Sequence, residues 1–337
     1  MADKYVVVLG AGRGSRMLSR DPDHSKVAYP ILGKPLINYV VDACKALDLK
    51  DIYVVVGYGG KATEKCVKDY AKVVWQKEIL GTGHALMQVK ELADKEGDVI
   101  VVGGDTPLLT TETLMKVYHK HQKNDNALTI CTSALADPHG YGRVIREKGS
   151  YRLLDIREDK DCTPEEAEIF EVNAGIYIIN NKLLQEYLPK LSNNNAKHEY
   201  YLSELVKLFN QKDYRVEAYV LEDAQDIFCV SDRAQLAYAA KTIRKRVNKE
   251  LMLSGVSIED PDTAYISPDA KLGKDCIIMP NTSILGKSEL GEANWIGPNT
   301  TLVDVKMGHD NHVSNSVLEG VTLGDGETVG PFEKRTK

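Results

Sequence analysis

The chain lacks the features that mark several large classes of protein. No stretch approaches the roughly 20 consecutive apolar residues that cross a membrane, and no signal-peptide pattern precedes the first apolar run. The net charge is −6 with both signs interspersed. Because no long basic stripe appears, nucleic acid is not an expected partner.

The cysteines are few and scattered. They show neither a Cys-x-x-Cys pair nor the spacing of a zinc site. This pattern is typical of reduced thiols, and it predicts a cytoplasmic protein. The six positions are Cys44, Cys66, Cys131, Cys162, Cys229 and Cys276.

The first 229 or so residues alternate between strand-like and helix-like patterns. Apolar strand-like runs lie at residues 6–9, 52–56, 73–75, 99–102, 128–132, 175–179 and 216–221. Helical patterns lie between the early runs, as at residues 36–47 and 111–121. This alternation predicts a Rossmann-like, doubly wound α/β sheet, in which ligands bind beyond the carboxyl ends of the strands.

A different period governs the C-terminal part. Apolar residues recur there every six positions, at Ile266, Leu272, Ile278, Ile284, Leu290, Ile296 and Leu302. The phase slips near residues 307–313 and resumes at Val317, Leu323 and Val329. A period of six predicts a parallel β-helix of hexapeptide repeats, each coil having three sides. The last repeat has no capping segment, so we expect an incomplete β-helix in a chain that is cut short.

Between these parts, residues 231–253 have the pattern of one helix. An apolar stripe runs along one face, and Lys241, Arg244, Lys245, Arg246 and Lys249 cover the other. Nucleic acid binding is one interpretation of that basic face, but the solvated face of a linking helix is favoured. We therefore expect a domain at 1–230, a linking helix at 231–253 and a left-handed parallel β-helix at 254–337.

The loop after the first strand-like run is rich in glycine. Gly10, Gly12 and Gly14 lie within five residues, and Arg16 follows them. Glycines let several backbone N–H groups approach an anion, and arginine adds a fork of donors suited to phosphate oxygens. The loop is neither a P-loop, because no lysine follows Gly14, nor a dinucleotide fingerprint, because its glycines are evenly spaced by two.

The loop resembles instead the Leu-x-x-Gly-x-Gly-Ser/Thr-Arg-Met signature of the sugar-1-phosphate nucleotidyltransferases. Lys26 and the sequence Gly-Lys-Pro at 33–35 follow in the order found in that family. Further motifs lie at residues 76–85, 103–108, 137–144, 158–161, 171–175 and 199–202. Together they resemble, along essentially the whole chain, the bacterial bifunctional N-acetylglucosamine-1-phosphate uridyltransferase / glucosamine-1-phosphate N-acetyltransferase family.

The resemblance implies transfer of uridylyl from UTP to N-acetylglucosamine-1-phosphate, for peptidoglycan and other envelope polysaccharides. It also implies Mg²⁺ as cofactor and a homotrimer assembled through the β-helix. The catalytic histidine and the acetyl-CoA-binding coils of the family have no counterpart in this chain, so acetyltransferase activity is not expected. Alternatives are a nucleotidyltransferase with another sugar or base preference, and a non-catalytic scaffold subunit.

The resemblance also implies roles for individual residues. Arg16 and Lys26 are the expected catalytic residues, and Asp105 and Ser231 the expected metal ligands, with Ser231 standing where the family has asparagine. The expected nucleotide-binding residues are Leu9, Ala11, Gly12, Gly14, Gln76, Gly81 and Thr82. The expected sugar-binding residues are Gly140, Glu158 and Asn173. For His84 we expect core packing or exposure and no metal.

Overall fold

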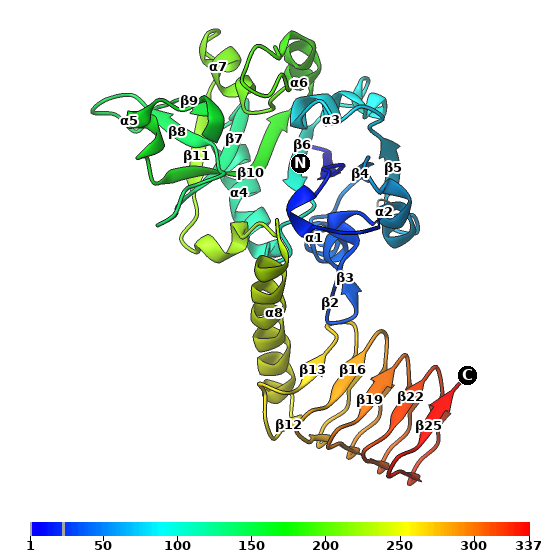
Figure 1. The fold of residues 1–337 in the computed structure, drawn as a ribbon. Coiled ribbons are helices and arrows are strands. Elements are labelled where there is room, and N and C mark those ends of the chain that lie inside the picture. The colour runs from blue at the N-terminus through cyan, green and yellow to red at the C-terminus, as the bar shows by residue number, and fades with distance from the viewer. Residues whose placement is uncertain (1, 22–23) are drawn as a thin grey trace. The chain divides into compact units, whose positions relative to one another are not determined.

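The computed structural model describes residues 2–21 and 24–337 and divides the chain into two compact units (Figure 1). The first unit comprises Met1–Tyr29 and Leu36–Arg233, and the second comprises Pro30–Pro35 and Ala234–Lys337. The short insert at 30–35 therefore folds with the C-terminal part of the chain. The three-part division drawn from the sequence stays a prediction.

The first unit is built on one nine-stranded sheet with the central order β11-β7-β10-β6-β1-β4-β5. Its strands are β1 (Lys4–Gly10), β4 (Asp51–Val56), β5 (Lys72–Trp75), β6 (Asp98–Gly103), β7 (Leu128–Ala134), β8 (Arg143–Arg146), β9 (Leu153–Arg157), β10 (Glu171–Asn180) and β11 (Val216–Val220). Strands β5, β4, β1 and β6 run parallel, whereas β10 is antiparallel to both β6 and β7. The predicted doubly wound α/β architecture is confirmed, with the antiparallel strand β10 within its central order and the antiparallel pair β8 and β9 beside it.

Helices cover this sheet. They are α1 (Leu36–Lys45), α2 (Gly60–Val67), α3 (Thr82–Met87), α4 (Thr111–Lys123), α5 (Pro164–Ala167), α6 (Asn181–Tyr187) and α7 (Glu204–Asn210). Short 3-10 turns lie at Ser15–Met17, Lys26–Ala28, Lys90–Leu92, Asp159–Asp161, Leu188–Lys190 and Ala224–Ile227. Val6, Val7 and Val8 of β1 are all fully buried, which places this strand between two covered faces.

The position of β1 in the sheet indicates where a ligand site is expected. Its sequence neighbour β4 lies on one side, and β6 lies on the other. The strand order therefore reverses at β1, and such a switch point opens a crevice at the carboxyl ends of the strands. The glycine-rich loop begins at that end of β1.

The second unit contains α8 (Arg233–Leu253) from Ala234 onward and three stacks of short parallel strands. One stack is β12 (Ser257–Ile258), β15 (Ile277–Ile278), β18 (Trp295–Ile296), β21 (His312–Val313) and β24 (Thr328–Val329). A second is β13 (Tyr265–Ile266), β16 (Ser283–Leu285), β19 (Thr301–Val303), β22 (Val317–Glu319) and β25 (Lys334–Thr336). The third is β14 (Lys271–Leu272), β17 (Glu289–Leu290), β20 (Lys306–Met307) and β23 (Thr322–Leu323).

These stacks form the predicted left-handed parallel β-helix, and its coils shorten along the chain. Ile278 pairs with Ile296, 18 residues later, but Ile296 pairs with Val313 after only 17. This shortening accounts for the slip in the hexapeptide phase. The prediction for Val317 is wrong, because that side chain is 40% exposed and Leu318 is the residue that points inward.

Two further features of the second unit differ from the sequence prediction or add to it. Arg244 does not lie on a solvated face of α8: it is buried and pairs with Asp262 at 2.9 Å. The insert forms a hairpin of β2 (Pro30–Ile31) and β3 (Lys34–Pro35). The ammonium of Lys34 in this hairpin donates to Asp269 of the β-helix at 2.7 Å.

Candidate active site

The loop that follows β1 is shaped around Lys26. Gly14 has a φ of +59°, and a Cβ added there would lie 2.6 Å from the Cβ of Lys26. Only glycine therefore lets this backbone come so close to the lysine. Ala11 is buried and Gly12 is exposed, with open space around its Cα hydrogens. The loop thus presents backbone toward open space at Gly12, as a phosphate-binding loop requires.

Lys26 forms an ion pair with Asp105, which follows β6. The two side chains are only 13% and 22% exposed. Burial works to lower the pKa of Lys26, but the Asp105 carboxylate outweighs it, and the pKa lies above its ordinary value. Burial works to raise the pKa of Asp105, but Lys26 outweighs it in turn, and that pKa lies below its ordinary value. Both groups are consequently charged at neutral pH.

Arg16 and Tyr141 lie near this pair. Arg16 is exposed on the 3-10 turn after the loop, and its charge acts on both Lys26 and Tyr141. Burial is the main cause that raises the pKa of Tyr141 to about 12, with Cys229 and Asp105 also contributing. The phenol is therefore neutral at physiological pH and can donate a hydrogen bond at the edge of the site.

The segment before α8 packs against Asp105. The Val230 N–H donates to the Asp105 carbonyl at 2.8 Å, and the Cys229 thiol donates to the Asp105 carboxylate. The Cys229 sulfur lies 4.0 Å from the Ser231 hydroxyl oxygen. These contacts bring the Ser231 hydroxyl into the neighbourhood of the Asp105 carboxylate.

This donor set fits Mg²⁺. A carboxylate and a hydroxyl are hard oxygen ligands, and Mg²⁺ in proteins keeps several waters and takes the rest of its shell from substrate phosphates. In the described parts of the chain, no three His, Cys, Asp or Glu side chains gather as a self-sufficient metal site. Asp105 and Ser231 would therefore hold the ion only in part, as a phosphate-dependent metal site does.

Gln76, at the end of β5, and Gly81 form a second group. The Gln76 side chain is 2% exposed, and its amide nitrogen lies 3.2 Å from the Gly81 carbonyl oxygen. The Thr82 hydroxyl accepts from the Leu202 N–H at 3.0 Å. Thr82 thus holds the segment that contains the predicted motif at 199–202. Its role at the nucleotide stays a prediction.

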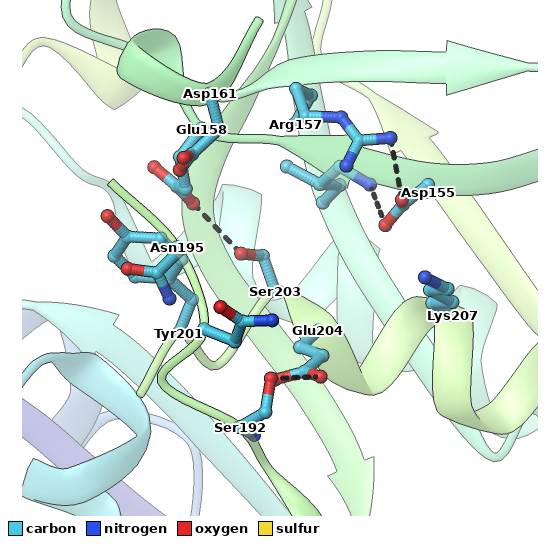
Figure 2. A pocket seen from close by; sticks show the side chains of 12 residues that line it. Asp155, Arg157, Glu158, Asp161, Ser192, Asn195, Tyr201, Ser203, Glu204 and Lys207 are labelled. Carbon is cyan, nitrogen blue, oxygen red and sulfur yellow. Dashed lines mark hydrogen bonds and ion pairs between the residues drawn. The ribbon is translucent and has the colours of Figure 1, made fainter. Parts of the chain in front are cut away.

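A cavity of about 290 Å³ lies beside Glu158 (Figure 2). The Glu158 carboxylate accepts from the Ser203 hydroxyl at 2.8 Å. The hydroxyl of Tyr201, which also lines the cavity, is buried without a hydrogen-bond partner in the described parts of the chain. Burial raises the pKa of Glu158, while Ser203 opposes the shift. The cavity therefore offers the Glu158 carboxylate to a polyhydroxylated ligand, whereas the Tyr201 hydroxyl beside it is sealed from solvent.

Asn173 and the loop at 140–142 lie next to Glu158 but outside the lining of this cavity. The Asn173 N–H donates to the Gly142 carbonyl at 2.8 Å, and a Cβ added at Gly142 would lie 3.3 Å from a Glu158 oxygen. Gly140 has a φ of +84° and open space around it. Backbone contacts thus bring the three predicted sugar-binding residues into one neighbourhood.

Sequence reasoning missed one buried residue behind this neighbourhood. Arg143 is fully buried, lies 3.1 Å from an Asp159 oxygen, and donates to the carbonyls of Tyr141 and Ala167. It therefore supports the loop at 140–142 and the turn after Glu158 together. The sequence signal was present, since Arg143 belongs to the motif at 137–144.

Comparison with known proteins identifies the family to which this chain belongs. Residues 6–162 match the MobA-like NTP transferase domain. The chain is 39% identical over 332 residues to the bifunctional protein GlmU of Thermoanaerobacter pseudethanolicus, an alignment that covers 98% of this chain and 72% of the relative. The chain belongs to the GlmU family. GlmU of Fervidobacterium nodosum is 41% identical over 329 residues, which cover 98% of this chain and 70% of that protein.

Membership of the GlmU family confirms the resemblance predicted from the motifs, and the domain match assigns the first unit to the nucleotidyltransferases. GlmU of Halalkalibacterium halodurans is 39% identical over 334 residues, covering 98% of this chain and 72% of its own. Both units therefore have counterparts in these relatives. In the described residues, no helix is long and apolar enough to cross a membrane.

Proposed function

We propose that this chain is a Mg²⁺-dependent uridyltransferase. It transfers uridylyl from UTP to N-acetylglucosamine-1-phosphate and releases UDP-N-acetylglucosamine and pyrophosphate, in the service of peptidoglycan and envelope synthesis. The observation that carries the proposal is the Lys26–Asp105 pair beside a glycine loop at the switch point of the sheet. The similarity to GlmU proteins supports the choice of family.

For this reaction the protein has to position the two substrates and neutralise the charge on their phosphates. An oxygen of the sugar phosphate forms a bond to the α-phosphorus of UTP, and the bond from that phosphorus to the β-phosphate oxygen breaks. The nucleophile is already an anion, so no side chain has to remove a proton. Arg16, Lys26 and the loop N–H groups hold the polyanions together and neutralise charge in the transition state. When bound, Mg²⁺ supplies further neutralisation of the phosphates.

Two other groups of residues recognise the base and the sugar. Gln76 and Gly81 face the base, and Thr82 holds the segment at 199–202 through the Leu202 N–H. Glu158, Asn173 and the Gly140 backbone hold the hydroxyl and N-acetyl groups of the sugar. A site that hydrogen-bonds a substrate group rejects analogues that lack the group, because its own polar atoms are then left unpaired.

The test is pyrophosphate release from UTP and N-acetylglucosamine-1-phosphate, with and without Mg²⁺. We expect Mg²⁺-dependent release, and lower kcat/KM with glucose-1-phosphate, dTTP or ATP. Acetyl transfer from acetyl-CoA to glucosamine-1-phosphate is measured in parallel, and none is expected. Absence of release with every sugar phosphate would contradict the proposal and favour a scaffold subunit.

We also propose that the β-helix assembles the chain into a homotrimer. Its side faces expose Tyr265, Trp295 and His312, whereas its interior is closed by aliphatic side chains. Light scattering should give three times the chain mass of 37.4 kDa. A monomeric mass at micromolar concentration would contradict this assembly.

Glu158 should make sugar binding depend on pH. Because burial raises the pKa of its carboxyl, the group takes up a proton as pH falls through that raised value, and a protonated carboxyl accepts sugar hydroxyls poorly. We expect the KM for N-acetylglucosamine-1-phosphate to rise as pH falls, with a smaller change in kcat. Initial rates across a pH series check this.

The control is Glu158→Gln, which has no proton to gain and should show a higher, pH-independent KM over the same range. The free energy of unfolding should respond to pH in the opposite direction to sugar affinity: it should rise as pH falls, whereas affinity falls. A carboxyl whose folded pKa lies above its unfolded value destabilises the fold as pH rises and the group ionises. An unchanged KM profile in Glu158→Gln would exclude this residue as the cause.

A further inference from the structure

The direction of the Gln76 amide is set by its surroundings. The two ends of a glutamine amide differ chemically, since the nitrogen donates and the oxygen accepts. One end lies 3.2 Å from the Gly81 carbonyl oxygen, which can only accept. That end must therefore be the NH₂ group, whatever the base site contains. The main chain of Gln76 is held as well, because its N–H donates to the Val56 carbonyl at 2.8 Å.

The second hydrogen of this NH₂ group points to His84. The amide nitrogen lies 3.0 Å from His84 Nδ1, on helix α3. On the other side of the ring, the amide nitrogen of Gln88 lies 3.2 Å from Nε2 and also donates to the His84 carbonyl at 3.0 Å. Two amide donors thus face the two nitrogens of one imidazole.

A neutral imidazole has only one acceptor nitrogen, so it can satisfy only one of these donors. Gln76 is 2% exposed, and a donor left unpaired there carries the full desolvation penalty. Gln88 is half-buried at the end of α3 and can turn toward water. The acceptor nitrogen is accordingly Nδ1, and it faces Gln76.

With both amide hydrogens engaged, only the oxygen of Gln76 is left for a ligand. In the described parts of the chain this oxygen accepts no hydrogen bond, and it is not sealed from solvent. An acceptor at this place matches a base that presents an N–H. Uracil has a hydrogen on N3, whereas N3 of cytosine is itself an acceptor.

We propose that His84 is a positioning residue that fixes the Gln76 amide with its oxygen toward the base, and so makes the site select UTP over CTP. The inference rests on the proposed function and deepens it by naming what sets base selectivity. His84 touches neither substrate in this scheme. It acts through Gln76, so its effect should appear in the choice between nucleotides more than in turnover with UTP.

The experiment measures kcat/KM for UTP and for CTP with N-acetylglucosamine-1-phosphate, in the full chain. His84→Leu removes one of the two acceptors that hold the Gln76 NH₂ group and leaves only the Gly81 carbonyl at 3.2 Å. The amide is then held less firmly, and the UTP-to-CTP ratio should fall by about 10-fold or more. His84→Asn places an amide oxygen near the position of Nδ1, and should keep most of the wild-type ratio. Gln88→Ala is the matched control on the other side of the ring, and should change the ratio by less than about 2-fold.

Binding of UTP and CTP by isothermal titration gives the same comparison without turnover, and His84→Ala replaces His84→Leu if the latter does not fold. A wild-type ratio in both apolar variants, with a lowered ratio in Gln76→Ala, overturns the role of His84 alone. A wild-type chain that releases no pyrophosphate from UTP overturns the proposed function instead. Equal loss of selectivity in His84→Asn and His84→Leu would also overturn the inference, because it would show that the acceptor does not matter.

Discussion

Lys26→Ala should lower kcat for pyrophosphate release by about 100-fold or more, the cost of removing one preorganised group that stabilises transition-state charge. Lys26 is the buried cation beside the glycine loop, and its ammonium is held charged by Asp105. Initial rates at saturating UTP and N-acetylglucosamine-1-phosphate measure the effect. Lys61→Ala, an exposed lysine in the same unit, is the matched control and should have near-normal turnover.

The same substitution also affects stability, and the two effects must be separated. Loss of Lys26 leaves the Asp105 carboxylate largely buried without its cation, which should cost roughly 1–3 kcal/mol, less than for a fully buried pair. The double variant Lys26→Met, Asp105→Leu removes both charges and should recover much of the free energy of unfolding. Its kcat should stay low. Activity that returned with stability would remove Lys26 from the mechanism.

Asp105→Asn should have the second largest effect. Asparagine keeps the shape of the side chain but loses the negative charge that holds Lys26 and would bind Mg²⁺. We expect kcat to fall by about 100-fold, as for a lost charge-stabilising group, and half-maximal activity to require a higher Mg²⁺ concentration. Titration of the rate with Mg²⁺ checks both expectations.

Ser231→Ala is the comparison for Asp105→Asn. A neutral hydroxyl is a weaker ligand than a carboxylate, so this variant should shift the Mg²⁺ requirement less than Asp105→Asn does. Ser231→Asn, which puts an amide oxygen in place of the hydroxyl, should shift it in the opposite direction. An Asp105→Asn chain with an unchanged Mg²⁺ requirement would contradict the assignment of Asp105 as a metal ligand.

The two periodicities predicted the architecture because each is a local property of the chain. Apolar runs separated by helical patterns belong to covered parallel strands, and a repeat of six belongs to a β-helix. The inward position of Leu318 was not predicted, because it follows from the shortened coils, in which Leu318 pairs with Leu302. Arg244 was misassigned because its partner Asp262 lies on a segment beyond the helix.

The candidate site was predicted where motifs lie at the ends of strands or follow one another in the order found in the family. Asp105 was identified in the first way and Lys26 from its place in the ordered motif, and the structure pairs them. Cys229, Tyr141 and Ser203 were not identified, because their relevance comes from contacts between segments far apart in sequence, such as that of Ser203 with Glu158. Nothing in the spacing of residues could show that the His84 ring lies between two amides.

The hairpin at 30–35 has a consequence for how this fold can be divided and exchanged. Its six residues interrupt the first unit yet belong to the second, where Ile31 is 1% exposed and Lys34 pairs with Asp269. A gene fragment that stopped after Arg233 would leave the Lys34 ammonium without its partner Asp269. A chimaera that takes its β-helix from another family member must therefore take its hairpin from the same source. Recombination at a single crossover cannot deliver both pieces, so the two halves of this protein are expected to have been inherited together.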